Sequence, residues 1–258
     1  TTRSASGVPR TASKSSFESL YLGAPRNSER FAGETVILPS AILSTHTSGF
    51  SNFTCLDLTL EMPKIINHWI NEKIQVDAIY TGYIGDCRQF DYILECKNKL
   101  LVNDGLFIVD PAMADYGKLY PALSLDIVEG MKRISSIADY IIPNITEASL
   151  LTNNEYKEEY DEEYIKMLVN DLYKLGAKNI ILTGVSFEKG KIGAVYYNGK
   201  DFISYFSNKI VKSYHGTGDI FSSIIVANIM NKVDIKDNLK DAVEFIIDCI
   251  LNTMDDEN

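Results

Sequence analysis

Short β-rich runs alternate with amphipathic stretches along the chain from Glu34 onward. Runs rich in Val, Ile, Tyr and Phe that end at polar or glycine residues are typical of strands. The predicted strands are Thr35 to Leu38, Ala78 to Thr81, Leu106 to Val109, Tyr140 to Ile142 and Asn179 to Leu182. Because helix-length segments separate them, the pattern indicates βαβ units and an α/β fold with a mostly parallel central sheet.

Between the strands, apolar residues recur at helical spacing, as Ile65, Ile66 and Trp69 do in the first of these segments. The predicted helices are Pro63 to Asn71, Arg88 to Leu101, Ser124 to Ser136, Glu162 to Leu175, Gly218 to Met230 and Asp237 to Met254. Two further β-rich runs, Gly193 to Tyr197 and Phe202 to Phe206, are joined by a turn that contains Asn and Gly. They predict an antiparallel hairpin that completes the sheet.

The chain of 258 residues is 45% hydrophobic and has a formal net charge of −10. This size and composition fit one large α/β domain with a hydrophobic core. The negative charge argues against binding to nucleic acid, whose phosphates attract a basic face. The four cysteines form no CxxC pattern, and no apolar run approaches the roughly 20 residues that cross a bilayer. We therefore expect a cytoplasmic protein that binds neither nucleic acid nor membranes.

Residues 1–33 differ from the rest of the chain. They hold five Lys and Arg against two acids, are rich in Ser, Thr and Gly, and show no hydrophobic period. Such a segment is typical of a disordered tail or a targeting remnant, and a frameshifted gene start is a further hypothesis for its origin. We expect 1–33 to be a disordered or non-native segment without a strand, and 34–258 to form the folded domain.

Polar residues follow the predicted strands at the positions where parallel sheets bind ligands. In such sheets the ligand lies beyond the carboxyl ends of the strands. The residues at these positions are Gly82-Tyr83, Asp110-Pro111, Asn144 to Glu147 and Thr183-Gly184. We expect them to meet at one edge of the sheet, together with Asp219.

Gly216, Thr217, Gly218 and Asp219 come just before an apolar run that is predicted to be helical. Two glycines let the backbone approach an anion, and the free N–H groups of a first helical turn attract phosphate. A carboxylate within that turn would repel phosphate, so Asp219 is better suited to take a proton from an attacking hydroxyl. The pattern therefore predicts phosphoryl transfer to an alcohol.

Six stretches of the chain together resemble, in order and spacing, the pyridoxal kinases of the ribokinase superfamily. They are Leu43-Ser44-Thr45-His46-Thr47, Thr81-Gly82-Tyr83, Val109-Asp110-Pro111, Pro143-Asn144-Ile145-Thr146-Glu147, Leu182-Thr183-Gly184 and Gly216-Thr217-Gly218-Asp219. Bacterial pyridoxal/pyridoxamine kinases are the most similar, through Asp110 to Met113, Gly117 to Tyr120 and Tyr214-His215. The resemblance covers residues 36 to 254 and implies a three-layer α/β/α ribokinase-like fold.

The resemblance implies a kinase that uses ATP to phosphorylate the 5′-hydroxymethyl group of pyridoxal, pyridoxamine or pyridoxine. Asp219 would be the base that deprotonates this hydroxyl. The N–H groups of Gly216, Thr217 and Gly218 would bind the phosphoryl group as negative charge shifts onto it during transfer. Pairing of two identical subunits is also expected.

The resemblance assigns further residues to the two substrates. Those implied for the vitamer pocket are Thr45, His46, Tyr83 and Asp219, with residues 48–59 as a lid. Those implied for ATP are Asp110, Asn144, Glu147, Thr183 and Gly184. Asp110 and Glu147 would also hold Mg²⁺, which keeps much of its water shell and needs few protein oxygens, and K⁺ is a further candidate ion.

Other interpretations of the same residues stay open. Hydroxymethylpyrimidine kinases share the fold and the base and are the nearest enzymatic alternative. Taken alone, Asn144 to Glu147 would be a helix-capping box, and Thr217 or Asp219 would simply cap a helix. Pyridoxal kinases also open with a strand and a glycine-bearing turn that residues 1–33 do not match. A catalytically inactive, truncated fragment that only binds ligand is therefore the third alternative.

Overall fold

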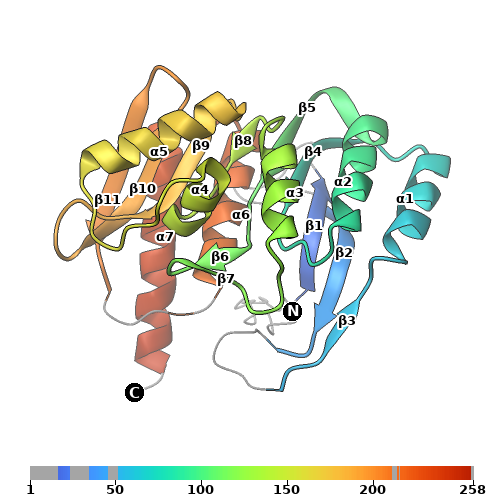
Figure 1. The fold of residues 1–258 in the computed structure, drawn as a ribbon, viewed down its shortest axis with the longest axis horizontal. Helices are drawn as coiled ribbons and strands as arrows, with labels where there is room; N and C mark the ends of the chain where they lie inside the picture. Colours follow the sequence, from blue (N-terminus) through green and yellow to red (C-terminus); the bar gives the residue numbers. More distant parts are fainter. Residues whose placement is uncertain (1–16, 24–34, 46–51, 211–213, 215, 257–258) are drawn as a thin grey trace, which may run out of the picture.

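The computed structural model describes residues 17–23, 35–45, 52–210, 214 and 216–256. Within them, nine strands form one sheet in the order β11-β10-β9-β8-β5-β4-β1-β2-β3 (Figure 1). The strands are β1 (Phe17–Gly23), β2 (Thr35–Leu43), β3 (Cys55–Asp57), β4 (Val76–Thr81), β5 (Leu101–Val109), β8 (Tyr140–Ile141), β9 (Ile180–Val185), β10 (Lys191–Tyr197) and β11 (Phe202–Asn208). The four in the middle, β4, β5, β8 and β9, are parallel, and the strands on both sides pair antiparallel.

Helices cover both faces of this sheet (Figure 1). On one face lie α1 (Met62–Asn71), α2 (Arg88–Lys99), α3 (Asp126–Ser135), α4 (Ile145–Thr152) and α5 (Glu162–Leu175). On the other lie α6 (Thr217–Met230) and α7 (Ile235–Asp256). The predicted three-layer α/β/α fold is therefore confirmed. Among the described residues, no helix has both the length and the apolar character that crossing a membrane requires.

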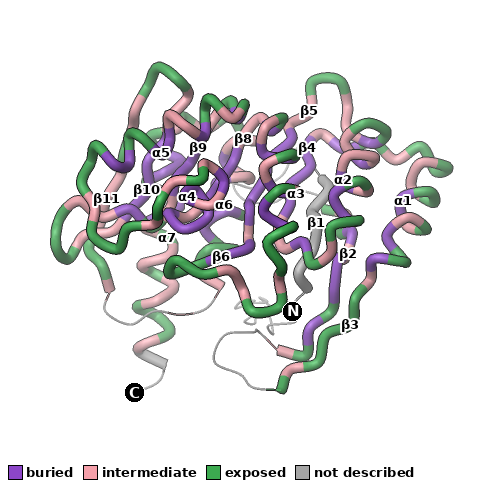
Figure 2. Tube along the Cα trace, in the orientation of Figure 1, coloured by how far each residue is buried: buried purple, intermediate pink, exposed green. Residues whose placement is uncertain are grey.

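The core consists of two clusters, one on each face of the sheet. Because side chains alternate along a strand, β5 contributes to both of them. Phe107 and Val109 belong to the cluster that contains α1 to α5, and Ile108 belongs to the cluster that contains α6 and α7. The middle strands are accordingly buried on both faces (Figure 2). Packing on both faces holds the ends of these strands in place. The residues that directly follow the strands are therefore also held in place.

The expectation that residues 1–33 contain no strand is wrong for Phe17–Gly23, which forms β1. β1 lies between β2 and β4 and pairs antiparallel with both, with Tyr21 opposite Tyr80 and Leu22 opposite Ile79. Without it, β4 would present an unpaired edge, and the run contains Phe, Tyr and Leu among its seven residues. The boundary between residues 33 and 34 stays a prediction.

Several predicted boundaries need smaller corrections, among them that of β2, which ends at Leu43 and not at Leu38. Helix α2 ends at Lys99 and not at Leu101, because Leu101 pairs with Val76 as the first residue of β5. Helix α3 begins at Asp126 and not at Ser124. A short hairpin, β6 (Ala114–Asp115) with β7 (Lys118–Leu119), was not predicted and follows β5 near the carboxyl edge of the parallel strands. By contrast, α5 has the predicted bounds.

Candidate active site

Asp110 directly follows β5, and its carboxylate is buried with 8% of the residue exposed. Its Oδ2 accepts two hydrogen bonds, from Tyr80 Oη at 3.0 Å and from Ser222 Oγ at 2.8 Å. Burial raises the pKa of Asp110 from 3.8 to about 7, and the negative charge of Asp219 adds to this rise, while the two hydroxyl donors oppose it. Asp110 is thus a buried acid whose ionised form needs further stabilisation.

Glu147 lies in the first turn of α4, and a capping box fixes its carboxylate. Asn144 Oδ1 accepts a hydrogen bond from Glu147 N at 2.9 Å, and Glu147 Oε2 accepts one from Asn144 N at 2.8 Å. Glu147 is only 3% exposed. Burial raises its pKa well above the usual value, and the nearby charge of Asp110 raises it further. The capping interpretation of this stretch is therefore correct, but it does not explain why two acids are buried near each other.

The β6–β7 hairpin is attached to this same stretch by hydrogen bonds. Met113 N and Ala114 N donate to Glu147 Oε1 at 3.1 and 3.5 Å, and Asn144 Nδ2 donates to Ala114 O at 2.8 Å. At the tip, Gly117 N donates to Thr146 Oγ1 at 3.0 Å. The backbone after Asp110 and the start of α4 therefore form one unit.

Gly216 is the N-cap residue of α6 and has a left-handed backbone with φ of 83°. Glycine adopts this conformation without strain. Among the described residues, nothing lies within 4 Å of where a Cβ on Gly218 would be. Asp219 is exposed in that turn, and its charge contributes to the raised pKa of Asp110. The predicted base and the two buried carboxylates therefore lie at the same edge of the sheet.

Thr183 and Gly184 lie at the carboxyl end of β9 and beside Asn144. Thr183 N donates to Pro143 O at 2.9 Å, and an isolated parallel bridge joins Asn144 with Thr183. Thr183 is half-buried, whereas Gly184 is exposed with φ of 72°. The five residues predicted for ATP thus lie at or just beyond the carboxyl ends of three neighbouring parallel strands, β5, β8 and β9.

The residues predicted for the vitamer pocket follow β2 and β4. Tyr83 is half-buried, and its carbonyl oxygen accepts a hydrogen bond from Ser40 Oγ at 2.9 Å. Thr45 Oγ1 is buried and has no hydrogen-bond partner among the residues that the structure describes. His46 and residues 48–51 of the predicted lid lie outside the described residues. The remaining lid residues include β3 at the edge of the sheet.

Three residues of this edge escaped the sequence analysis, namely Tyr80, Ser222 and Gln89. The side chain of Gln89 links three segments around the predicted vitamer pocket. It donates to Ser40 O at 3.2 Å and to Thr59 Oγ1 at 2.8 Å, and it accepts from Gly85 N at 3.1 Å. The sequence offered one signal for Gln89, namely that it is a polar residue on the otherwise apolar face of a predicted helix.

Asp110 and Glu147 are chemically suited to a divalent cation. Both are buried and both have raised pKa values, so a positive charge would favour their ionised forms. The described part of the chain contains no group of three or more His, Cys, Asp or Glu side chains that could hold a metal ion. Mg²⁺ does not need such a group, since it is usually bound by one or two carboxylates, waters and substrate phosphates.

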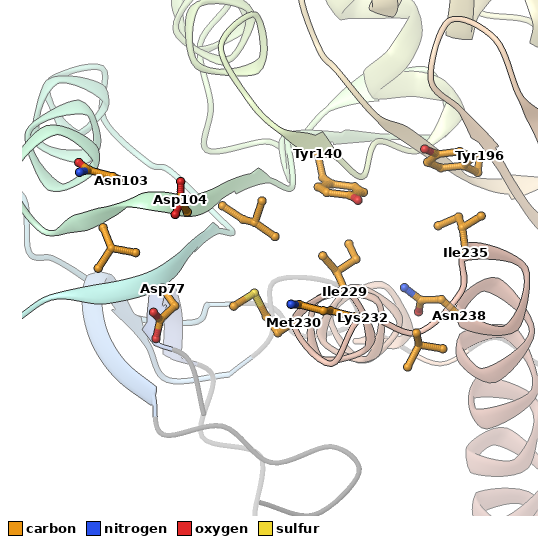
Figure 3. Close-up of a pocket in the computed structure, with 13 residues that line it drawn as sticks. Asp77, Asn103, Asp104, Tyr140, Tyr196, Ile229, Met230, Lys232, Ile235 and Asn238 are labelled. Carbon is orange, nitrogen blue, oxygen red and sulfur yellow. The ribbon is translucent and has the colours of Figure 1, made fainter. Parts of the chain in front are cut away.

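A separate pocket of about 750 Å³ lies at the opposite, amino edge of the parallel strands (Figure 3). It lies between the first residues of β4, β5 and β8 and the C-terminal end of α6, and Asp77, Asp104, Tyr140 and Lys232 are among its lining residues. It contains none of the predicted site residues. This pocket is therefore separate from the buried carboxylates Asp110 and Glu147.

The sequence of residues 33–257 matches the family described as phosphomethylpyrimidine kinase. The chain belongs to this family. A hydroxymethylpyrimidine/phosphomethylpyrimidine kinase of Aquifex aeolicus is 34% identical over 133 residues, which are 51% of this chain and 51% of the relative. The pyridoxal kinase of Dictyostelium discoideum is 27% identical over 190 residues, which are 68% of this chain and 61% of the relative. The chain thus matches about half to three fifths of the length of these curated relatives.

Solved structures of this kinase family have the same fold. A Bacteroides thetaiotaomicron protein assigned to the phosphomethylpyrimidine kinases superposes with a TM-score of 0.80 at 35% identity, covering 84% of this chain and 75% of its own. Its second crystal form, with pyridoxal, gives a TM-score of 0.77 at 34% identity, covering 82% of this chain and 75% of that one. The relatives of the chain therefore include both kinds of kinase that the sequence analysis weighed, and its predicted relationship to pyridoxal kinases is confirmed.

Proposed function

We propose that this chain is an ATP- and Mg²⁺-dependent kinase that phosphorylates the 5′-hydroxymethyl group of pyridoxal, pyridoxamine or pyridoxine. One observation carries the proposal. Asp219 is exposed in the first turn of α6 and electrostatically coupled to Asp110, which is in turn coupled to Glu147. A reachable carboxylate beside a pair of buried ones suits a base that works next to a cation and phosphates.

In this mechanism Asp219 accepts the proton of the substrate hydroxyl, and the hydroxyl oxygen attacks the terminal phosphorus of ATP as the bond from that phosphorus to ADP breaks and ADP leaves. The backbone N–H groups of Gly216, Thr217 and Gly218 stabilise the charge that shifts onto the phosphoryl oxygens. Asp110 and Glu147 would hold Mg²⁺, which supplies positive charge to the phosphates when bound. Asn144 and Thr183 line the same edge and orient the nucleotide.

The preference for a B6 vitamer is supported by the relatives. The Bacteroides thetaiotaomicron protein, 34% identical to this chain, was crystallised with pyridoxal. Thr45 and Tyr83 are the described residues proposed to contact the ring, and the Gln89 hydrogen bonds link segments near them. Hydroxymethylpyrimidine kinase activity is the second candidate, and the relative from Aquifex aeolicus, at 34% identity, favours it.

The test is ADP release by the purified chain with MgATP and each of pyridoxal, pyridoxamine, pyridoxine and hydroxymethylpyrimidine. We expect turnover with a B6 vitamer that disappears in Asp219→Asn. Turnover with hydroxymethylpyrimidine alone would assign the second candidate. A folded wild-type chain that turns over none of the four would favour the ligand-binding fragment, and nucleotide binding measured by calorimetry would then show whether binding survives.

Two further parts of the proposal concern K⁺ and the oligomeric state. ADP release in potassium and in sodium buffers measures any requirement for K⁺. Pairing of two subunits is supported by apolar side chains on β2 and β3, since Ile37 is 45%, Ile42 40% and Leu56 59% exposed. We expect sedimentation equilibrium to show a dimer. A monomer at all concentrations would contradict the proposed pairing of two subunits.

A further inference from the structure

Tyr80, Asp110 and Ser222 form a buried polar cluster that joins three elements. Tyr80 belongs to β4, Asp110 follows β5, and Ser222 lies in α6, and these residues are 6%, 8% and 3% exposed. Both hydroxyl groups donate to the same oxygen, Asp110 Oδ2. A carboxylate that accepts two hydroxyl donors from fixed elements has a defined plane and little freedom to rotate.

The two oxygens of Asp110 therefore differ. Oδ2 faces β4 and α6, whereas Oδ1 accepts no hydrogen bond from any residue within the described ranges. In Glu147, by contrast, both carboxylate oxygens accept backbone N–H groups. Of the two buried acids, Asp110 has one oxygen that is fixed by the protein and one that is left for a ligand.

Ser222 also connects this carboxylate to the predicted base. Asp219 and Ser222 are three residues apart in α6, so they lie on the same side of the helix. The bond from Ser222 Oγ thus ties the helix that carries Asp219 to the strand end that carries Asp110. A shift of either element would change the distance between Asp219 and Asp110.

We propose that Tyr80 and Ser222 are positioning residues that orient Asp110 so that Oδ1 is presented to the divalent cation and the nucleotide phosphates. This inference rests on the proposed function of the same edge. Neither hydroxyl touches the substrate, and each acts through Asp110. Partners of this kind typically contribute 10- to 100-fold to metal affinity or activity.

The experiment compares Tyr80→Phe and Ser222→Ala with a matched control, Tyr196→Phe. Tyr196 is 7% exposed, belongs to the same core cluster as Tyr80, and donates its hydroxyl to the neutral Asn179 Oδ1 at 2.6 Å. The control removes a buried tyrosine hydroxyl with a short hydrogen bond, but at the amino edge of the sheet. It therefore measures the purely structural effect of such a deletion.

The main readout is the binding of Mn²⁺ in the presence of ADP, which electron paramagnetic resonance measures directly. We expect Tyr80→Phe and Ser222→Ala each to raise the Mn²⁺ dissociation constant about 10-fold, and Tyr196→Phe to leave it within twofold of the wild type. Ser222→Thr keeps a hydroxyl and should recover most of the affinity. In kinase assays, the Mg²⁺ concentration at half-maximal rate should rise in the two deletions while KM for the vitamer stays unchanged.

Several results would overturn the inference. Mn²⁺ affinities of Tyr80→Phe and Ser222→Ala that match the wild type, or that fall no further than in Tyr196→Phe, would show a structural role only. A wild-type chain that binds no Mn²⁺ with ADP would contradict both the inference and the Mg²⁺ proposal.

A different result would separate the inference from the proposed function. If the wild type binds Mn²⁺ with ADP and the variants bind it more weakly, but the wild type phosphorylates no substrate, the inference is retained and the proposed function is rejected.

Discussion

The two edges of the parallel sheet carry similar side chains in different environments. At the carboxyl edge, Asp110 and Glu147 are buried, and burial raises the pKa of both. At the amino edge, Asp104 is exposed and Asp77 half-buried along the walls of a pocket that also contains Lys232 (Figure 3). Water surrounds the acidic side chains at the amino edge, whereas the carboxylates at the carboxyl edge accept hydrogen bonds from protein donors.

A pair of tyrosines illustrates the same difference. Tyr80 and Tyr196 belong to one core cluster and are about equally buried. The hydroxyl of Tyr80 donates to a carboxylate and that of Tyr196 to a neutral amide. Hydrogen bonds to charged groups are generally stronger than those to neutral groups. The hydrogen bond of Tyr80 at the carboxyl edge is therefore expected to be stronger than that of Tyr196 at the amino edge. Among the described residues, the buried acids Asp110 and Glu147 both lie at the carboxyl edge.

The largest effect is expected for Asp219→Asn, which removes the base but keeps the size of the side chain. Turnover should fall by about 10²- to 10⁴-fold, because proton transfer by a positioned base contributes this much. Nucleotide affinity, measured by calorimetry, should change little. Wild-type turnover in this variant would show that the base is another residue. It would contradict the assignment of the kinase site to the carboxyl edge.

A second pair of variants compares the edges directly. Asp110→Asn should lower kcat by about 10²-fold, because it removes the buried carboxylate that is proposed to hold the cation. Asp104→Asn, at the amino edge, should leave kcat within about twofold, since surface substitutions away from special features have small effects. Steady-state kinetics with the preferred vitamer measures both. Equal losses in the two variants would remove the distinction between the edges.

A smaller effect is expected on the pH dependence of stability without nucleotide or metal. Because the pKa of Asp110 is raised in the folded state to about 7, folding stabilises its protonated form. This contribution is fully present below the unfolded pKa near 3.8 and is lost as the pH rises through about 7. Glu147, whose pKa is also raised, acts in the same direction.

Urea unfolding at pH 5 and at pH 8 tests this expectation. The wild type should lose more stability between the two values than Asp110→Asn does, since the amide does not titrate. Asp104→Asn should retain the wild-type difference, because its carboxylate is exposed. A wild type and an Asp110→Asn variant with the same pH difference would show that Asp110 is not the buried acid described here.

Local patterns predicted much of the fold because the relevant interactions are local. Helix α5 has the predicted bounds, since Asp161 caps it through Tyr164 N at 2.9 Å and Gly176 ends it with φ of 123°. The end of α2 was wrong because Leu101 follows the helix without a glycine and is taken up by β5. Strand β1 escaped because its pairing with β4 depends on a strand more than 50 residues away.

The candidate site divides in the same way. The residues after the strand ends were predictable, because parallel strands bring their carboxyl ends to one edge. Ser222 was not, since its partner Asp110 lies 112 residues earlier in the chain, and Tyr80 is 30 residues from the same partner. In the sequence, Ser222 is one of two adjacent serines in an apolar helix, and only the packing of α6 against the sheet gives its hydroxyl a charged acceptor.

The most direct test of the central claim is mass-spectrometric detection of the phosphorylated vitamer after incubation of pyridoxal with MgATP and the wild type, Asp219→Asn or Asp104→Asn. We predict pyridoxal 5′-phosphate with the wild type and with Asp104→Asn, and at least a 10²-fold lower yield rate with Asp219→Asn. Equal formation of the phosphorylated product by the wild type and Asp219→Asn would contradict the assignment of the carboxyl edge as the kinase site.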